Sequence, residues 1–206
     1  MYRLTKGTDY ILLIVYMDDL LRIGSTDDVT AWFEGELQRD LMLTISSTVT
    51  TFRQDRQAVL HASLANNQLN GPIPAEIGLL TKLTIMYLHN NKFTGFIPDE
   101  IGFMTKLIAL SLYSNKLSGS VPSSITQLTA LTFLYLYNNQ LSGSIPAEIG
   151  SMSRLSILSL HTNHLTRSIP SAIGSLSKVN IMVLDNNRLD GSIPVGIKTL
   201  SRLALL

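Results

Sequence analysis

The chain has 206 residues, of which 45% are hydrophobic and 15% are charged, and its formal net charge is +1. These values fit a globular protein with a sizeable core, and they give no overall positive charge that would hold a nucleic acid through its phosphates. The chain contains no cysteine, which excludes disulfides, thiolate zinc sites and a cysteine nucleophile.

The first apolar run, residues 11–17, is too short to span a bilayer. Asp18 and Asp19 come directly after it, where a signal peptide would need small residues for cleavage. The sequence therefore predicts no membrane segment and no signal peptide. It also lacks an Asn-x-Ser/Thr acceptor for N-glycosylation, and together these features favour a location inside the cell.

Residues 1–45 contain the stretch "ILLIVYMDDLLRIGS", in which Tyr16, Met17, Asp18 and Asp19 stand between apolar runs. An amphipathic helix is predicted after it, with apolar residues on one face at Val29, Trp32, Phe33, Leu37 and Leu41. This hairpin and helix resemble the palm region of a copia-type retrotransposon reverse transcriptase. The resemblance implies that Asp18 and Asp19 correspond to a metal-binding pair.

Two-metal phosphoryl transfer needs carboxylates from more than one segment, and only 15 residues precede Tyr16. We therefore expect Asp18 and Asp19 to be inactive and the segment to be a retroelement fragment. We expect the hairpin and helix to cover the apolar edge of the structure formed by the residues after 58, and residues 46–58 to form a junction.

Residues 59–206 repeat with a period of 24, as the segments "NNQLNGPIP" and "NNQLSGSIP" illustrate. One asparagine recurs in the same register, at Asn67, Asn91, Asn115, Asn139, Asn163 and Asn187. A short alternating stretch before each asparagine predicts a strand, and the asparagine amide can satisfy backbone groups where the chain turns. The glycine four residues later suits a positive φ, and proline then fixes φ and stops any helix. Such units form a continuous core only by stacking.

These repeats resemble plant-type leucine-rich repeats, with six near-complete copies and a truncated seventh. The resemblance implies an α/β fold: a curved right-handed solenoid with a parallel sheet on its concave face, preceded in this chain by the small hairpin-plus-helix segment. Related proteins are often extracellular and receptor-like, and they bind proteins or peptides without catalysis. This chain departs from the pattern at Arg167, which replaces the glycine, and in lacking cysteine-paired caps. The final coil has no polar cap, so self-association through it is a further expectation.

Strand alternation points two residues per coil away from the core, on the concave side of the sheet, which we call its outer face. They lie two and four positions before each asparagine. The first position holds His89, Tyr113, Tyr137 and His161, the second holds Tyr87 and Tyr135, and Phe133 lies two residues earlier still. Tyrosine is enriched at binding hot spots, although β-propensity alone also favours it on strands. We predict the protein-binding surface at Tyr87, His89, Tyr113, Phe133, Tyr135, Tyr137 and His161.

The remaining motifs predict no catalytic, cofactor or metal site. The histidines of the repeats, His61, His89, His161 and His164, are spread over several coils, and the glycine-containing repeats lack a phosphate-loop lysine. No positive stripe lies among the outward strand residues, so a nucleic-acid partner is not expected. The sequence thus predicts a non-enzymatic repeat module that binds a protein or peptide on its concave face. The alternative is a vestigial retroelement fragment fused to a truncated repeat array, with no activity of its own.

Overall fold

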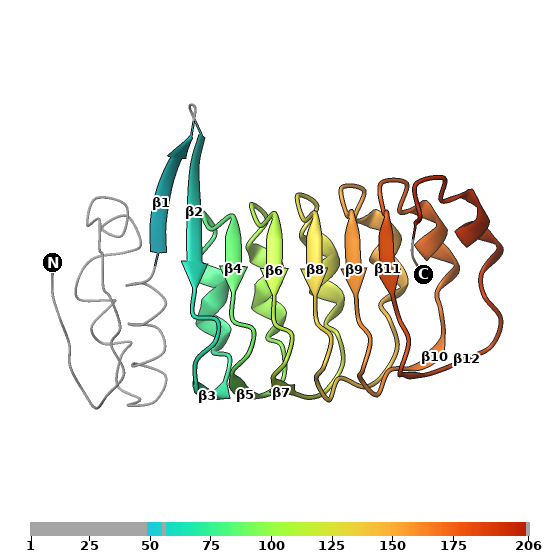
Figure 1. The fold of residues 1–206 in the computed structure, drawn as a ribbon, viewed down its shortest axis with the longest axis horizontal. Coiled ribbons are helices and arrows are strands. Elements are labelled where there is room, and N and C mark those ends of the chain that lie inside the picture. The colour runs from blue at the N-terminus through green and yellow to red at the C-terminus, as the bar shows by residue number, and fades with distance from the viewer. Residues whose placement is uncertain (1–48, 55–56, 205–206) are drawn as a thin grey trace, which may run out of the picture.

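The computed structural model describes residues 49–54 and 57–204. Within these residues the chain forms a solenoid in which every coil contributes one strand to a single long sheet (Figure 1). The hairpin and helix predicted in residues 1–45, with Asp18 and Asp19, lie outside the described residues.

The main sheet has seven strands in the order β1-β2-β4-β6-β8-β9-β11. Their bounds are β1 Val49–Gln54, β2 Gln57–Ser63, β4 Ile85–Tyr87, β6 Ala109–Ser111, β8 Phe133–Tyr135, β9 Ile157–Ser159 and β11 Ile181–Val183. From β2 onward the strands are parallel, and the register pairs Ile85 with Ala109, which is a shift of one repeat. The predicted parallel sheet of stacked coils is thus confirmed.

Six short 3-10 helices of the described coils lie on the far side of this sheet (Figure 1). They are η2 Ala75–Leu79, η3 Asp99–Phe103, η4 Ser123–Gln127, η5 Ala147–Ser151, η6 Ser171–Ser175 and η7 Val195–Thr199. Each begins directly after a proline, as Pro98 before η3 illustrates with φ −67°. Proline therefore stands immediately before a helix in each coil, where its fixed φ is compatible with a helix start.

A second, smaller set of parallel ladders runs along the lower side of the coils in Figure 1. It consists of β3 Asn70–Pro72, β5 Lys92–Gly95 and β7 Lys116–Leu117, a single bridge between Ser120 and Ser142, and the pair β10 Thr166–Ser168 with β12 Arg188–Asp190. These strands come after the asparagine turns, so each coil is hydrogen-bonded to its neighbours on two sides.

The core is a column of aliphatic side chains repeated coil by coil, with Leu88, Leu112 and Leu136 at most 1% exposed. The asparagine side chains form a ladder beside it. Asn139 donates from Nδ2 to the carbonyls of Leu112 (3.0 Å) and Leu136 (3.1 Å) and accepts from the Leu117 N–H (3.0 Å). The asparagine thus satisfies backbone groups of its own coil and of the preceding coil, as predicted.

Two positions in each coil have a positive φ. The glycine position has φ between +72° and +84° in five coils, and Arg167 adopts +67° at the same place in another. The residue before each ladder asparagine is also left-handed, with Ser114 and Thr162 both at +54°. The sequence predicts the first position, whereas at the second only the asparagines, and not Ser114 or Thr162, favour a positive φ.

The segment assigned to a junction contains regular structure. Strand β1 pairs antiparallel with β2, and its register joins Val49 to Ala62 and Gln54 to Gln57. Residues Val49–Phe52 are β-branched or aromatic, the types that strands favour. β1 thus extends the sheet beyond the first coil. The sequence predicts that the hairpin and helix upstream, and not residues 46–58, cover this edge.

Candidate functional site

The outer face of the sheet carries the aromatic side chains that strand alternation predicts. Residues three and five before each ladder asparagine are buried, as Leu134 and Leu136 show with no exposure. Their alternating neighbours Tyr135 and Tyr137 are half-buried on the other side. The parity of each strand therefore separates core residues from face residues in every coil.

Four rings from consecutive coils form one stacked column. The centroid distances are 4.3 Å for His89 and Tyr113, 4.4 Å for Tyr113 and Tyr137, and 4.4 Å for Tyr137 and His161. Interplanar angles of 7° to 13° make the rings nearly parallel. The distances reflect the spacing of neighbouring strands, roughly 4.8 Å, because each ring stands on the next strand of the ladder.

The column continues toward the first coil in a different geometry. Tyr87 lies 5.6 Å from His89 at 60° and 5.2 Å from His61 at 81°. Edge-to-face and offset contacts of this kind each stabilise a ring pair by about 0.5–1.5 kcal/mol. The aromatic face is therefore ordered by its own contacts before any partner binds.

A shallow open depression of about 300 Å³ lies in the middle of this face. It is lined by Tyr87, His89, Ser111, Tyr113, Tyr135 and Tyr137. Ser111 is 2% exposed, and its hydroxyl lies 3.0 Å from His89 Nδ1. A small residue at this point leaves room between the two tyrosines one coil away on either side, Tyr87 and Tyr135.

Burial favours the uncharged form of three residues of the lining, His89, Tyr135 and Tyr137. Burial, with the neighbouring phenols of Tyr113 and Tyr135 and a hydrogen bond with Tyr113, raises the pKa of Tyr137 to about 12. Burial also raises the pKa of Tyr135, and burial lowers the pKa of His89 below its usual range. All these shifts favour the uncharged form of each ring.

Six of the seven predicted residues take part in the stacked column or the depression. Phe133 opens strand β8 on the same face but does not line the depression. Ser111 was not predicted. The signal was present, because serine alternates with tyrosine four residues before the asparagine at Ser63, Tyr87, Ser111, Tyr135 and Ser159, and such alternation creates gaps.

The described part of the chain offers neither a metal cluster nor a membrane span. Within it, no group of three or more His, Asp or Glu side chains is placed to hold a metal ion. No helix among these residues is long and apolar enough to cross a membrane.

Comparison with known proteins identifies the repeats. A model of the leucine rich repeat matches residues 81–141, and a second leucine rich repeat model matches residues 154–176. One protein in the solved BIR3–SERK2 complex from Arabidopsis thaliana is 32% identical, with a TM-score of 0.61, and the alignment covers 72% of this chain and 78% of that one. The chain belongs to the leucine-rich-repeat family.

Other leucine-rich-repeat structures are similar over much of the chain. The plant peptide hormone receptor RGFR1, solved in complex with RGF2, is 41% identical with a TM-score of 0.69, over 70% of this chain and 23% of the receptor. A plant ice-binding protein is 32% identical with a TM-score of 0.67, over 77% of this chain and 50% of that one. This chain thus spans less than a quarter of the RGFR1 chain.

No curated protein matches the chain. None of the family or structure matches supports the likeness of residues 1–45 to a reverse transcriptase, and that part of the leucine-rich-repeat chain is not described by the structure.

Proposed function

We propose that the leucine-rich-repeat region is a non-catalytic module that binds a peptide or an extended protein segment on the outer face of its sheet. The observation that carries the proposal is the continuous aromatic column with the depression beside it, centred on Tyr113 and Tyr137. Parallel coils place these rings in a line, so an extended chain lying across the coils meets one ring after another.

The chemistry of the face supports a protein ligand. Tyrosine contributes a large apolar surface and a hydroxyl with little conformational entropy to lose, which is why it is enriched at interface hot spots. Stacking already holds the rings in place, so binding a ligand costs little further side-chain entropy. At about 300 Å³ the depression is at the lower end of small-molecule sites and suits one side chain of a larger ligand.

The comparisons point the same way. RGFR1 is described as a peptide hormone receptor bound to RGF2, and another solved neighbour, HAESA from Arabidopsis, is described in complex with the peptide hormone IDA and the co-receptor SERK1. HAESA is 34% identical over 68% of this chain. These similarities favour a peptide ligand for the present chain.

The test is selection of binders from a display library of random peptides on the whole protein, with affinity measurements on variants. Tyr113→Ala and Tyr137→Ala are each expected to weaken binding by about 2 kcal/mol, roughly 30-fold. Neither ring fills the core, so circular dichroism should show retained structure. Tyr137→Phe separates the role of the hydroxyl from that of the ring.

Phe103→Ala is the matched control, because Phe103 is an aromatic residue at the end of η3 on the opposite side and is 59% exposed. It is expected to bind peptides as the unmodified protein does. If Phe103→Ala abolished binding while both tyrosine variants bound normally, the site would lie among the 3-10 helices and the proposal would be wrong.

A second candidate function is binding to an ice surface, as the similarity to a plant ice-binding protein suggests. The favouring observation is a column of exposed serines in successive coils beside the second ladder: Ser120, Ser144, Ser168 and Ser192. The neighbouring Ser118, Ser142 and Thr166 hydroxyls all donate to the glycine carbonyl of the preceding coil, at 3.3–3.4 Å.

The two functions use different faces, so they can be separated. An ice-recrystallisation assay should give small crystals with the unmodified protein and large ones with Ser144→Lys, whereas Tyr137→Ala should behave as the unmodified protein does. Crystal growth equal to that in an albumin control would exclude this candidate.

A further inference from the structure

The charged side chains of the repeats are sorted by position. Residues 61–204 contain ten cations, and eight of them occupy only two positions of the 24-residue repeat. The first position lies nine residues before the ladder asparagine, and it holds Lys82, Lys106, Arg154, Lys178 and, at the equivalent place in the last coil, Arg202. The second position directly follows the asparagine, and it holds Lys92, Lys116 and Arg188. All eight are exposed.

These two positions lie at opposite ends of the strands. The first falls in the loops that lead from each 3-10 helix into the next coil, at the upper edge of the sheet in Figure 1. The second is the first residue of the short strands β5, β7 and β12, which follow the asparagine turns at the lower edge. We call them the upper and lower basic borders.

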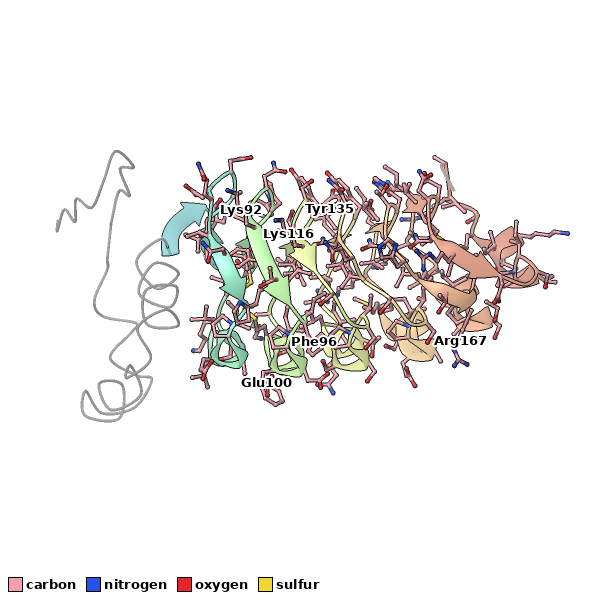
Figure 2. All side chains as sticks on the ribbon, turned by 90° about the horizontal axis from the view of Figure 1, so that it is seen from below. Lys92, Phe96, Glu100, Lys116, Tyr135 and Arg167 are labelled. Atoms are coloured by element: carbon pink, nitrogen blue, oxygen red, sulfur yellow. The ribbon has the colours of Figure 1, made fainter. Side chains whose placement is uncertain are left out.

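The acidic side chains are placed differently. Four of the six in residues 61–204 lie on the 3-10 helices behind the sheet: Glu76, Asp99, Glu100 and Glu148. Figure 2 shows Lys92, Lys116 and Tyr135 on one side of the molecule and Glu100 on the other. The borders therefore carry positive charge beside a neutral aromatic face, with Asp185 the single carboxylate at the outward strand positions of the described coils.

The border cations form no ion pairs within the described part of the chain. Among the described residues none of the eight is paired with a carboxylate, and Lys92 bonds only the amide oxygen of Gln68, at 3.2 Å. The upper border is interrupted at Ala130 and the lower border at Gln140 and His164, so like charges stand at successive coils for Lys82 with Lys106, Lys92 with Lys116, and Arg154 with Lys178 and Arg202. Like charges in neighbouring coils repel one another unless counterions or a partner neutralise them. Such charges raise the local concentration of anionic ligands.

We propose that the partner of the aromatic face is an acidic segment of a peptide or protein, whose carboxylates lie over the basic borders while an uncharged side chain occupies the depression. The inference rests on the proposed peptide-binding function and names the chemistry of its ligand. The positions of the cations require a ligand with charge at its flanks and apolar character at its centre.

This pattern distinguishes a peptide from a uniform polyanion. A nucleic-acid strand lying on this face would place phosphates over Tyr87, Tyr113 and Tyr137, where no cation of the described coils meets them. A peptide of mixed sequence avoids that cost, because its neutral residues can lie over the rings. The expectation that nucleic acid is not bound was based on the net charge of +1 and on the strand positions, and neither takes account of the basic borders.

The experiment is selection from a display library of random peptides on four proteins. They are the unmodified chain, a lower-border variant Lys92→Gln/Lys116→Gln, an upper-border variant Lys106→Gln/Arg154→Gln, and a control Arg167→Gln/Lys198→Gln. The control removes the same number of charges from β10 and η7, at positions that belong to neither border and lie several coils from Lys92 and Lys116. It therefore corrects for the effect of net charge on association.

On the unmodified chain and the control, selected peptides should be enriched in Asp and Glu relative to the starting library. Each border variant should bind those peptides roughly three- to tenfold more weakly, as the loss of two exposed charge contacts implies. Added salt should weaken binding to the unmodified chain more than to the border variants. Replacing the acidic residues of a selected peptide by Gln and Asn should reproduce the loss.

Selected peptides without acidic enrichment, which still depend on Tyr113 and Tyr137, would overturn this inference and leave the proposed function intact. Failure to select any peptide above background would count against both. A single-stranded oligothymidine that binds more tightly than the selected peptides and needs the same border cations would show that the partner is a nucleic acid and not an acidic peptide.

Discussion

Arg167→Gly is expected to stabilise the protein, although it removes a large side chain. Arg167 has φ +67° at a position where five other coils place glycine with φ between +72° and +84°. Its side chain is exposed, and it has no hydrogen-bond or ion-pair partner among the described residues. The substitution therefore relieves backbone strain and removes no polar contact.

The magnitude is the difference of two opposing terms. A left-handed backbone costs a non-glycine residue about 1–2 kcal/mol, which the variant recovers. Glycine adds freedom to the unfolded chain, which lowers stability by about 0.5–1 kcal/mol. The net gain is about 1 kcal/mol, which for a chain of this size raises the Tm by roughly 2–4 °C.

Urea and thermal unfolding monitored by circular dichroism measure this change. Gly71→Ala is the reciprocal control, because Gly71 has φ +84° and a Cβ built there meets nothing within 4 Å. It should lose about 1 kcal/mol of stability, because the strain of about 1–2 kcal/mol is partly offset by the lower freedom of alanine in the unfolded chain, about 0.5–1 kcal/mol. If Gly71→Ala were destabilising and Arg167→Gly did not raise the Tm, the arginine side chain would contribute packing that offsets its strain, and the reasoning would be refuted.

Three further predictions concern stability. Thr162→Asn should raise the free energy of unfolding by up to about 1 kcal/mol in urea titrations, because Thr162 is β-branched at φ +54° and asparagine tolerates that conformation better. Asn139→Ala should lower it by about 2–4 kcal/mol, since buried backbone groups of two coils lose their partner, whereas the exposed Asn67→Ala should cost less. Because the folded pKa of Tyr137 is raised from 10.0 to about 12, its contribution is fully present below pH 10 and is lost as the pH rises toward 12; Tyr137→Phe should flatten this fall.

The 24-residue period was sufficient to predict the parallel sheet, its register and the face that each strand residue occupies. Leu112 and Leu136 are buried and Tyr113 and Tyr137 are not, because alternation along a strand allows no other arrangement once the stacking is fixed. The stacked rings result from the same rule.

Other features depend on contacts that periodicity does not specify. The left-handed residue before each ladder asparagine could not be predicted, since Asn, Ser and Thr all occupy it and only the asparagines favour a positive φ. The depression could not be predicted from the tyrosines alone. It needs the small Ser111 between Tyr87 and Tyr135. The gap forms because the strands of Tyr87 and Tyr135 lie on either side of the strand of Ser111.

The repeat also explains where binding chemistry can be placed at little cost to the fold. The leucines, the ladder asparagine, the glycine and the proline are fixed by burial, hydrogen bonding or φ, and changing any of them loses stability. The two borders are exposed, and the face positions are exposed or half-buried except at the buried Ser111 and Ser159, so tyrosine, histidine or lysine can occupy most of them without disturbing a neighbouring coil. The aromatic residues gather in the coils from Tyr87 to His161, while the cations extend from Lys82 to Arg202. A ligand that contacts the rings is therefore held near the middle of the array. The basic borders extend further along the array, so they can attract and orient the acidic residues that flank the bound part of the ligand.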